Sequence, residues 1–219
     1  MKLKIGVIFG GRSGEHEISI RSAATVLQQI DKEKYEVIPL AITEAGRWLN
    51  PAESLALLPK TVRELLAESI ENFPLNAVAL LGDTKYKGLT RLDAQNSENQ
   101  TAPLDVVFPV LHGTFGEDGT IQGLLEMADL PYVGCGVLAS ACGMDKVVMK
   151  TLFRDADLPI CKYVWFLRAE WERRGEDVIA QTEQKLGYPC FVKPANLGSS
   201  VGVSRADDKE TLRAAIELA

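Results

Sequence analysis

Lys4-Ile-Gly-Val-Ile-Phe9 and the stretch Gly10-Gly-Arg-Ser-Gly14 that follows it indicate how this chain folds. The first is a short apolar run of strand type, and the glycines interrupt it. A helical pattern comes next, with apolar side chains near one face at Ile18, Ala23, Val26, Leu27 and Ile30. Another apolar run covers residues 36–42. Strand, glycine turn, helix and strand in this order predict a βαβ unit and therefore a parallel sheet.

The same kinds of pattern continue along the chain and divide it into two units. Further strands are predicted over residues 77–81, 105–111, 161–167, 189–193 and 201–204. Further helices are predicted over residues 55–70 with a break near Pro59, 120–130, 137–155, 170–186 and from about Asp208. The fold class is thus α/β, with a doubly wound, largely parallel, Rossmann-like domain over residues 1–135. A second, smaller unit covers residues 136–219.

Two local features of the first unit also carry predictions. Ser19 or Ser22 is a candidate cap for the start of the first helix, because serine hydroxyls accept from free N–H groups there. Residues 82–102 are the most polar part of the chain and are predicted to form an exposed hairpin or loop without chemistry of its own.

The composition limits the classes of protein to consider. The chain has 219 residues, of which 46% are hydrophobic and 25% charged, as in an ordinary globular protein. Its formal net charge is −6, which argues against non-specific binding of nucleic acid. No apolar run approaches the roughly 20 residues that span a bilayer. We therefore expect neither a nucleic-acid nor a membrane partner, and a cytoplasmic location.

The cysteines and histidines give no sign of a zinc site. None of the four cysteines belongs to a C-x-x-C pair, and His16 and His112 are not spaced with them as zinc ligands would be. Cys161 and Cys190 lie in apolar, strand-like contexts and are predicted to be buried thiols. A reducing compartment fits this usage.

One glycine-rich loop is suited to phosphate binding. Phe191-Val-Lys-Pro-Ala-Asn-Leu-Gly-Ser-Ser-Val-Gly-Val203 places Lys193 at the end of an apolar strand, before a Gly-Ser-Ser-x-Gly loop. Backbone N–H groups of such a loop can surround phosphate oxygens, and the lysine adds a positive charge. The spacing is not that of a Walker A loop, and a glycine hairpin between two strands is the structural alternative.

Polar residues also follow two predicted strands of the first unit. Glu15-His-Glu17 comes after the first strand, and His112 opens the stretch His112-Gly-Thr-Phe-Gly-Glu-Asp-Gly119 after another. Open α/β sheets bind ligands at this edge, so Glu15 can hold an ammonium group and His112 a carboxylate or phosphate. A solvated loop charge and a packed histidine are the alternatives. Glu117 and Asp118 fit the first turn of a helix, and the first glycine turn lacks the G-x-G-x-x-G spacing of dinucleotide sites.

Taken in order, these stretches resemble the D-alanine–D-alanine ligases of the ATP-grasp superfamily. The resemblance runs from residue 4 to residue 204. It rests on motifs that begin at Gly10, His112, Tyr132, Met144 and Lys193. It implies that residues 136–219 form the first, incomplete part of an ATP-grasp α+β domain. It also implies ATP-dependent joining of two D-alanines, through an acyl phosphate, for peptidoglycan synthesis.

The resemblance further implies roles for individual residues. Glu15 is expected to orient the ammonium of the first D-alanine, with Ser199 as its hydrogen-bond partner, and both count as catalytic. His112 is expected near the substrate carboxylate. The expected ATP-binding residues are Lys146, Lys193, Gly198, Ser199, Ser200, Val201 and Gly202. The roles of Lys146 and of Ser199 as distinct from Ser200 come from the resemblance alone.

In such ligases the ligands for Mg²⁺ or Mn²⁺ lie beyond the position of residue 219, so no metal ligand is expected in this chain. We therefore expect a truncated chain that releases no phosphate from ATP and D-alanine on its own, which a phosphate assay checks. The alternatives are a D-alanyl-D-lactate or another ATP-grasp ligase, and a non-catalytic binding module. A homodimer is possible in each case. A Rossmann-type redox enzyme is a weaker alternative.

Overall fold

The computed structural model describes residues 2–70, 78–92, 101–198 and 200–219. It separates into two compact units, Met1–Ala141 and Cys142–Ala219, and each is described by itself. The predicted boundary between residues 135 and 136 stays a prediction. No helix within the described ranges is both long and apolar enough to cross a membrane.

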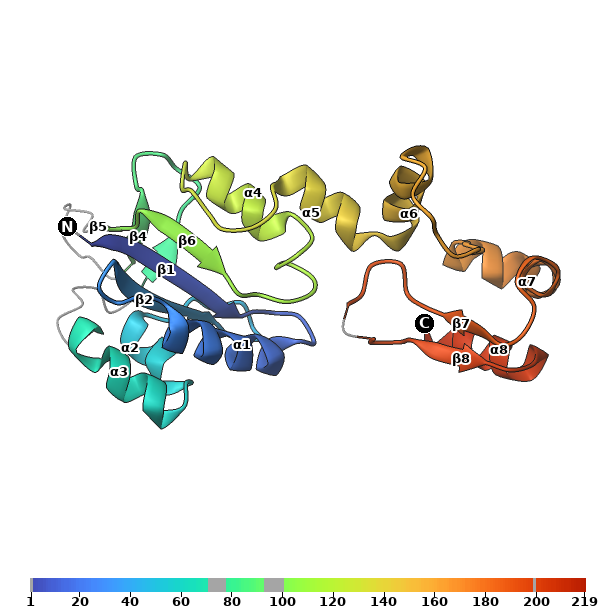
Figure 1. Cartoon of the computed structure of the whole chain (residues 1–219), viewed down its shortest axis with the longest axis horizontal. Helices are drawn as coiled ribbons and strands as arrows, with labels where there is room; N and C mark the ends of the chain where they lie inside the picture. The colour runs from blue at the N-terminus through green and yellow to red at the C-terminus, as the bar shows by residue number, and fades with distance from the viewer. Residues whose placement is uncertain (1, 71–77, 93–100, 199) are drawn as a thin grey trace. The chain divides into compact units, whose positions relative to one another are not determined.

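A parallel sheet of three strands forms the centre of the first unit (Figure 1). Its strands are β1 (Leu3–Gly10), β2 (Tyr35–Ile42) and β6 (Val106–Pro109). They lie in the order β2-β1-β6, and β1 pairs in parallel with both neighbours. The predicted βαβ unit is confirmed, because α1 (His16–Gln29) connects β1 to β2.

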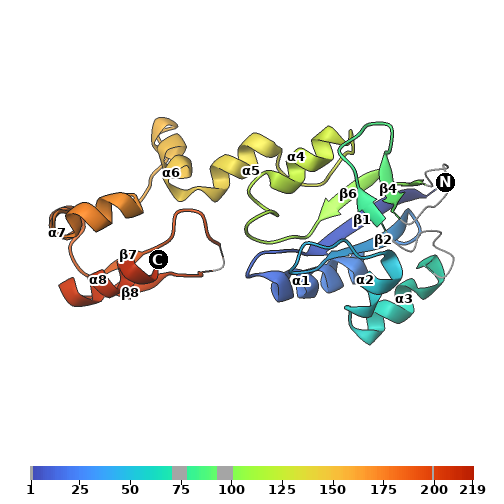
Figure 2. The same ribbon diagram turned by 180° about the vertical axis from the view of Figure 1, so that it is seen from behind.

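Both faces of this sheet are covered. Alternate residues of β1 point to opposite faces, so Ile5, Val7 and Phe9 join one core and Ile8 the other. The first core lies under α1, α2 (Pro51–Ala56) and α3 (Lys60–Ile70). The second lies under α4 (Thr120–Met127) and an antiparallel sheet made of β3 (Val78–Leu80), β4 (Gly88–Arg91) and β5 (Thr101–Pro103). Figure 2 shows α4 and the helix group α1 to α3 on opposite sides of β1.

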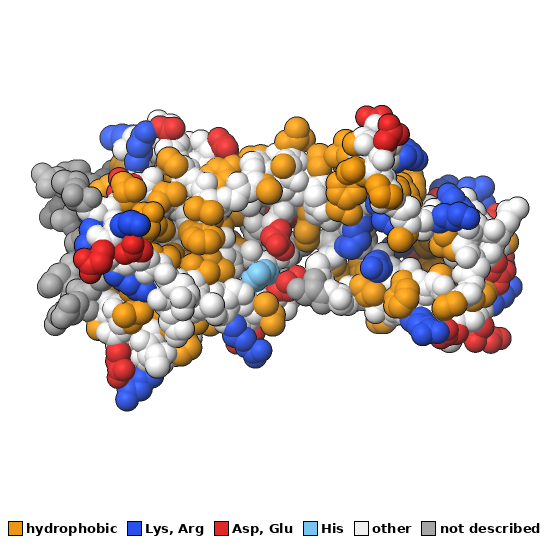
Figure 3. All heavy atoms as spheres, in the orientation of Figure 1, with side chains coloured by type: hydrophobic (Ala, Val, Ile, Leu, Met, Phe, Trp, Pro, Cys, Tyr) orange, Lys and Arg blue, Asp and Glu red, His pale blue; other side chains and the backbone are white. Residues whose placement is uncertain are grey.

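The second unit is a smaller α+β structure. After α5 (Val137–Met144) come α6 (Lys146–Asp155), α7 (Arg168–Lys185), β7 (Cys190–Val192), β8 (Ser204–Ala206) and α8 (Lys209–Leu218). β7 and β8 form an antiparallel pair, and their inner residues Cys190 and Ala206 pack with α7 and α8. Helix α6 has no buried residue and exposes Val148, Leu152 and Phe153, so hydrophobic side chains gather over it in Figure 3.

Several expectations for local structure are wrong. Residues 161–167 form no strand, and Cys161 is exposed rather than buried. The strand expected at 201–204 begins only at Ser204, because the glycine-rich loop extends further. Strand β4 in the polar segment 82–102 is largely buried, although its antiparallel pairing with β5 confirms a hairpin. Residues 93–100 of that segment lie outside the described residues.

Other expectations are confirmed. Asp208 begins α8 as its N-cap and accepts a hydrogen bond from the Thr211 N–H. Cys190 is buried, and burial raises the pKa of its thiol.

The first helix does not begin at a serine. Glu15 occupies the N-cap position of α1 without a side-chain cap, so the expected cap at Ser19 or Ser22 is wrong. Ser19 is fully buried and links three elements instead. Its Oγ accepts from the Gly10 N–H at 2.8 Å and donates to the Val110 carbonyl at 2.6 Å. One hydroxyl thus ties α1 to the ends of β1 and β6, where the candidate site lies.

Replacing Ser19 with alanine is expected to destabilise the first unit by about 1–3 kcal/mol, because a buried N–H and a buried carbonyl each lose their partner. Chemical denaturation together with hydrogen exchange of the β1 amides measures the loss. Thr25→Ala on the exposed side of the same helix serves as the control and should cost much less. Equal stability of the two variants would contradict the role given to Ser19.

Candidate active site

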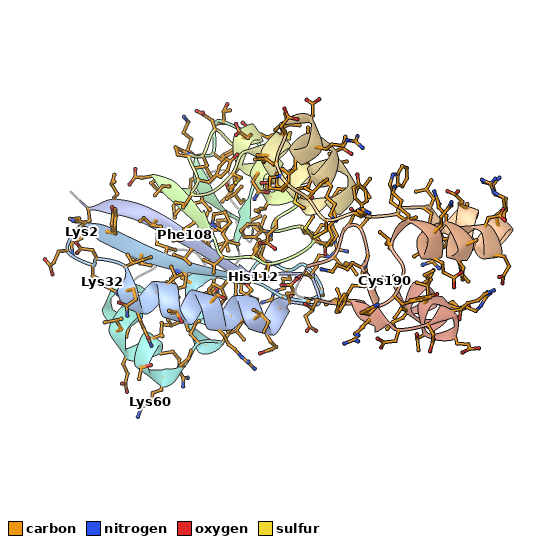
Figure 4. The ribbon with its side chains drawn as sticks, turned by 45° about the vertical axis from the view of Figure 1, so that its right-hand side comes forward. Lys2, Lys32, Lys60, Phe108, His112 and Cys190 are labelled. Atoms are coloured by element: carbon orange, nitrogen blue, oxygen red, sulfur yellow. The ribbon has the colours of Figure 1, made fainter. Side chains whose placement is uncertain are left out.

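The two residues predicted from strand ends, Glu15 and His112, lie close together in the first unit. Glu15 follows β1 and His112 follows β6, and parallel neighbours end at the same edge of a sheet. Figure 4 shows Phe108 on β6 and His112 beyond the end of that strand, beside α1. Glu15 is only 6% exposed, which rules out the alternative of a solvated loop charge.

Ser13 connects these two residues. Its Oγ donates to the His112 carbonyl at 2.7 Å and accepts from the Glu15 N–H at 3.2 Å. Gly113 lies directly against the carboxylate, since a Cβ at this position would be 3.0 Å from Glu15 Oε1. Gly113 also has a φ of +68°, so a side chain here would be strained and would crowd the site.

The loop after His112 is held in a fixed shape by its own side chains. Glu117 accepts from the Gly113 N–H at 2.7 Å, and Asp118 accepts from the Phe115 N–H at 2.9 Å. Gln122 on α4 donates to the Gly116 carbonyl at 2.9 Å. Helix α4 begins only at Thr120, so Glu117 and Asp118 precede its first turn and brace the loop, contrary to expectation. Asp118 does also accept from the Thr120 N–H.

The histidines of this region are both oriented by hydrogen bonds. His16 Nδ1 lies 2.8 Å from the Gly11 carbonyl oxygen. His112 Nε2 lies 3.0 Å from Ser22 Oγ on α1. The sequence does not predict a part in the site for Ser13 or Ser22. A local sequence pattern cannot predict their hydrogen bonds, because their common partner His112 lies 99 and 90 residues away along the chain.

Lys146 is a second centre of polar contacts, in the second unit. Its Nζ donates to the Leu197 carbonyl at 2.5 Å and lies 3.4 Å from the Ala195 carbonyl. Its backbone N–H also bonds to Ala195, at 3.0 Å. Asp145 caps α6 by accepting from Val147 and Val148. The start of α6 is thereby fixed against the loop that follows β7.

This arrangement brings together Lys146 and Lys193, both predicted to bind ATP. The pKa of Lys146 is lowered first by burial and then by the positive charge of Lys193, with Asp145 opposing both. Two ammonium groups that repel one another favour a bound anion, because an anion would relieve the repulsion. The pair is therefore a candidate site for phosphate oxygens.

The glycine-rich loop beyond β7 has an unusual backbone. Ser200 has a φ of +61° and Gly202 a φ of +67°, and left-handed residues of this kind occur in the loops whose successive N–H groups bind anions. Turns close through bonds from Val201 N–H to the Gly198 carbonyl and from Val203 N–H to the Ser200 carbonyl. Ser199, predicted to be catalytic, lies outside the described residues. The ATP-binding roles of this loop stay predictions.

Possible metal ligands are not clustered in the residues that the structure describes. In the part of the chain that the structure describes, no group of three or more His, Cys, Asp or Glu side chains could hold a metal ion.

Comparison with known proteins identifies the family. A family model described as the D-ala D-ala ligase N-terminus matches residues 4–135, and one described as the D-ala D-ala ligase C-terminus matches residues 152–219. The chain belongs to the D-alanine–D-alanine ligase family. A D-alanine–D-alanine ligase of Natranaerobius thermophilus is 46% identical over 218 residues, which are 100% of this chain and 57% of the relative.

Solved structures of the same family are similar throughout the chain. The VanG D-Ala:D-Ser ligase of Enterococcus faecalis is 36% identical with a TM-score of 0.76, covering 100% of this chain and 60% of that one. The D-alanine–D-alanine ligase of Coxiella burnetii is 32% identical with a TM-score of 0.78, covering 99% and 60%. The chain thus spans less than two thirds of the length of these relatives. The predicted α/β fold with part of an ATP-grasp domain is confirmed.

Proposed function

We propose that this chain carries the part of an ATP-dependent D-alanine–D-alanine ligase that binds the first D-alanine and the phosphates of ATP. Membership of the ligase family supports this. The observation that carries it is the buried carboxylate of Glu15 beside His112, with Ser13 bonded to both residues.

In this proposal Glu15 binds the ammonium of the first D-alanine. A carboxylate that is 6% exposed can pair strongly with a positive charge, because little water competes for it. His112 donates a hydrogen bond to the carboxylate at the other end of the same amino acid. Ser199 is the proposed partner of Glu15.

Lys146, Lys193 and the loop Gly198, Ser199, Ser200, Val201 and Gly202 are proposed to bind the phosphates. A carboxylate oxygen of the first D-alanine attacks the γ-phosphorus, and the bond from this phosphorus to the β–γ bridging oxygen breaks. The products of that step are an acyl phosphate and ADP. The amine of the second D-alanine then attacks the acyl carbon, phosphate leaves, and the nitrogen loses a proton. Positioning and positive charge assist both steps.

The decisive experiment uses the product of the encoding gene, read to its own stop codon. Supplied with ATP, Mg²⁺ and D-alanine, it should release one phosphate and one ADP for each D-alanyl-D-alanine formed. Omitting D-alanine should abolish phosphate release. Phosphate release that does not depend on D-alanine would overturn the proposal.

The second substrate needs a test of its own. One structural relative is named a D-Ala:D-Ser ligase and others D-alanine–D-alanine ligases, so this fold accompanies more than one second substrate. Competition among D-alanine, D-serine and D-lactate, with the products separated by mass, decides among them. We propose D-alanine, because the curated relatives at 46% and 47% identity are D-alanine–D-alanine ligases.

The compartment and assembly are proposals as well. An enzyme of peptidoglycan precursor synthesis that consumes ATP would work in the cytoplasm. The possible homodimer is tested by sedimentation of the gene product.

Lys193→Met in that gene product is expected to raise the KM for ATP about 10- to 30-fold, because a charge-assisted contact to phosphate is lost. The KM for D-alanine should change little. Lys162→Met, at an exposed lysine of the same unit, is the matched control. If both variants bind ATP like the parent protein, Lys193 does not contact the phosphates.

A further inference from the structure

Ser22 makes a contact that the proposed function does not use. It lies in the second turn of α1, and its Oγ is 3.0 Å from Nε2 of His112, which is 90 residues away along the chain. A helical serine commonly bonds instead to the carbonyl four residues earlier. Within the described residues, the hydrogen bond found for Ser22 Oγ is the one to His112. Its hydroxyl is therefore directed at the imidazole.

The backbone of His112 is fixed separately from its ring. Ser13 Oγ donates to the His112 carbonyl at 2.7 Å, so this hydroxyl holds the main chain. Ser22 holds the far side of the ring. The residue is thus held at two points by serines from the β1–α1 turn and from α1 itself.

We propose that Ser22 is a positioning residue, which donates its hydroxyl hydrogen to Nε2 and thereby keeps the proton of the neutral His112 ring on Nδ1. In a neutral imidazole one nitrogen is a donor and the other an acceptor, so a donor at Nε2 fixes the proton at Nδ1. No hydrogen bond joins Nδ1 to another residue in the described ranges. The Nδ1–H group is left to serve as a donor to a ligand.

The consequence for the site rests on the proposed function. A carboxylate accepts hydrogen bonds and donates none when ionised, so it needs an N–H at the ring nitrogen that faces it. If the proton moved to Nε2, a lone pair on Nδ1 would face the carboxylate and repel it. Ser22 therefore selects for a carboxylate ligand without touching it.

The tautomer can be measured directly and without a ligand. The chain has two histidines, so the ring nitrogens of ¹⁵N-labelled protein give few signals, and His16→Gln assigns them. The neutral form of His112 should show a protonated Nδ1 and an unprotonated Nε2. Ser22→Ala should shift the population toward the Nε2–H form, and Ser22→Thr, which keeps a hydroxyl, should restore the original pattern. Thr25→Ala should leave it unchanged.

An Nε2–H tautomer in the parent protein, or an unchanged tautomer in Ser22→Ala, would overturn the proposal. Circular dichroism shows whether each variant is folded. If Ser22→Ala does not fold, the His112 tautomers of the parent protein and of Ser22→Thr decide the question.

Kinetics of the gene product test the effect on binding. Ser22→Ala should raise the KM for the first D-alanine about tenfold, the effect of one well-placed hydrogen bond, with kcat and the KM for ATP nearly unchanged. Ser22→Thr should recover most of the loss. A shifted tautomer with an unchanged KM would overturn the positioning role. A parent protein that shows the Nδ1–H tautomer but makes no dipeptide would overturn the proposed function and leave the tautomer assignment standing.

Discussion

Glu15→Gln should raise the KM for the first D-alanine about 100-fold in the product of the encoding gene, since breaking a buried charge pair costs several kcal/mol. The amide has nearly the same shape as the carboxylate, so it fits the space beside Gly113. The bond from the Glu15 N–H to Ser13 belongs to the backbone and persists. The variant therefore removes the negative charge with little change to the packing. Initial rates at varied D-alanine concentrations measure the effect.

Glu17→Gln is the matched control for this prediction. It makes the same chemical change two residues further along, at an exposed side chain in the first turn of α1. Its KM for D-alanine should stay within about twofold of the parent value, because exposed charges interact weakly. The KM for ATP should be unchanged in both variants. Similar kinetics for the two variants would show that Glu15 does not bind the ammonium.

Much of the first unit could be predicted because its signals are local. β1, α1 and β2 follow one another with short connections. The two strands are continuous apolar runs buried on both faces, and α1 buries one face with the helical period. The positions of Glu15 and His112 at one sheet edge follow from the parallel order of the strands. By contrast, Ile18 was placed on the buried face of α1 but is 44% exposed. The spacing of Ile18 fits one face of a helix, but its burial depends on which other elements pack against that position.

Residues 161–167 show the limit of local patterns. Their apolar and aromatic residues fit a strand, but a strand needs a partner for its N–H and C=O groups. In the described part of the second unit, β7 and β8 pair with each other and neither pairs with this segment. Trp165 and Leu167 are consequently exposed. The residue types of a segment do not show whether another strand is available to pair with it.

The sequence points to charged candidate residues in each unit but not to the residues that support them. Glu15 and His112 in the first unit and Lys193 in the second stand out because charged or titratable side chains follow apolar strands there. Ser19 and Ser22 look like helix caps, and only the structure shows that their hydroxyls bond to Val110 and His112. A serine near a helix start can be interpreted from the sequence as a helix cap. Its hydrogen bond to a residue far away along the chain is therefore not anticipated.

The largest loss of stability is expected from Gly10→Ala, about 3–5 kcal/mol, which is a large part of the stability of an ordinary domain. Gly10 has a φ of +82°, where a side chain is strained. A Cβ there would lie 2.4 Å from the Ile42 carbonyl oxygen, and the backbone of β2 cannot move away without breaking its pairing with β1. Chemical denaturation monitored at β1 amides measures the loss.

Gly14→Ala provides the control within the same turn. Apart from Gly14 itself and its two chain neighbours, no described residue has an atom within 4 Å of the position where its Cβ would be, and Gly14 does not have a positive φ. Alanine should therefore be tolerated there, with a change below about 1 kcal/mol in either direction. Because Gly10 also donates its N–H to Ser19, Gly10→Ala should loosen the start of α1 and weaken D-alanine binding as well. Equal stability of Gly10→Ala and Gly14→Ala would contradict this prediction. It would show that the tight turn at Gly10 is not required to position Glu15 at the end of the sheet.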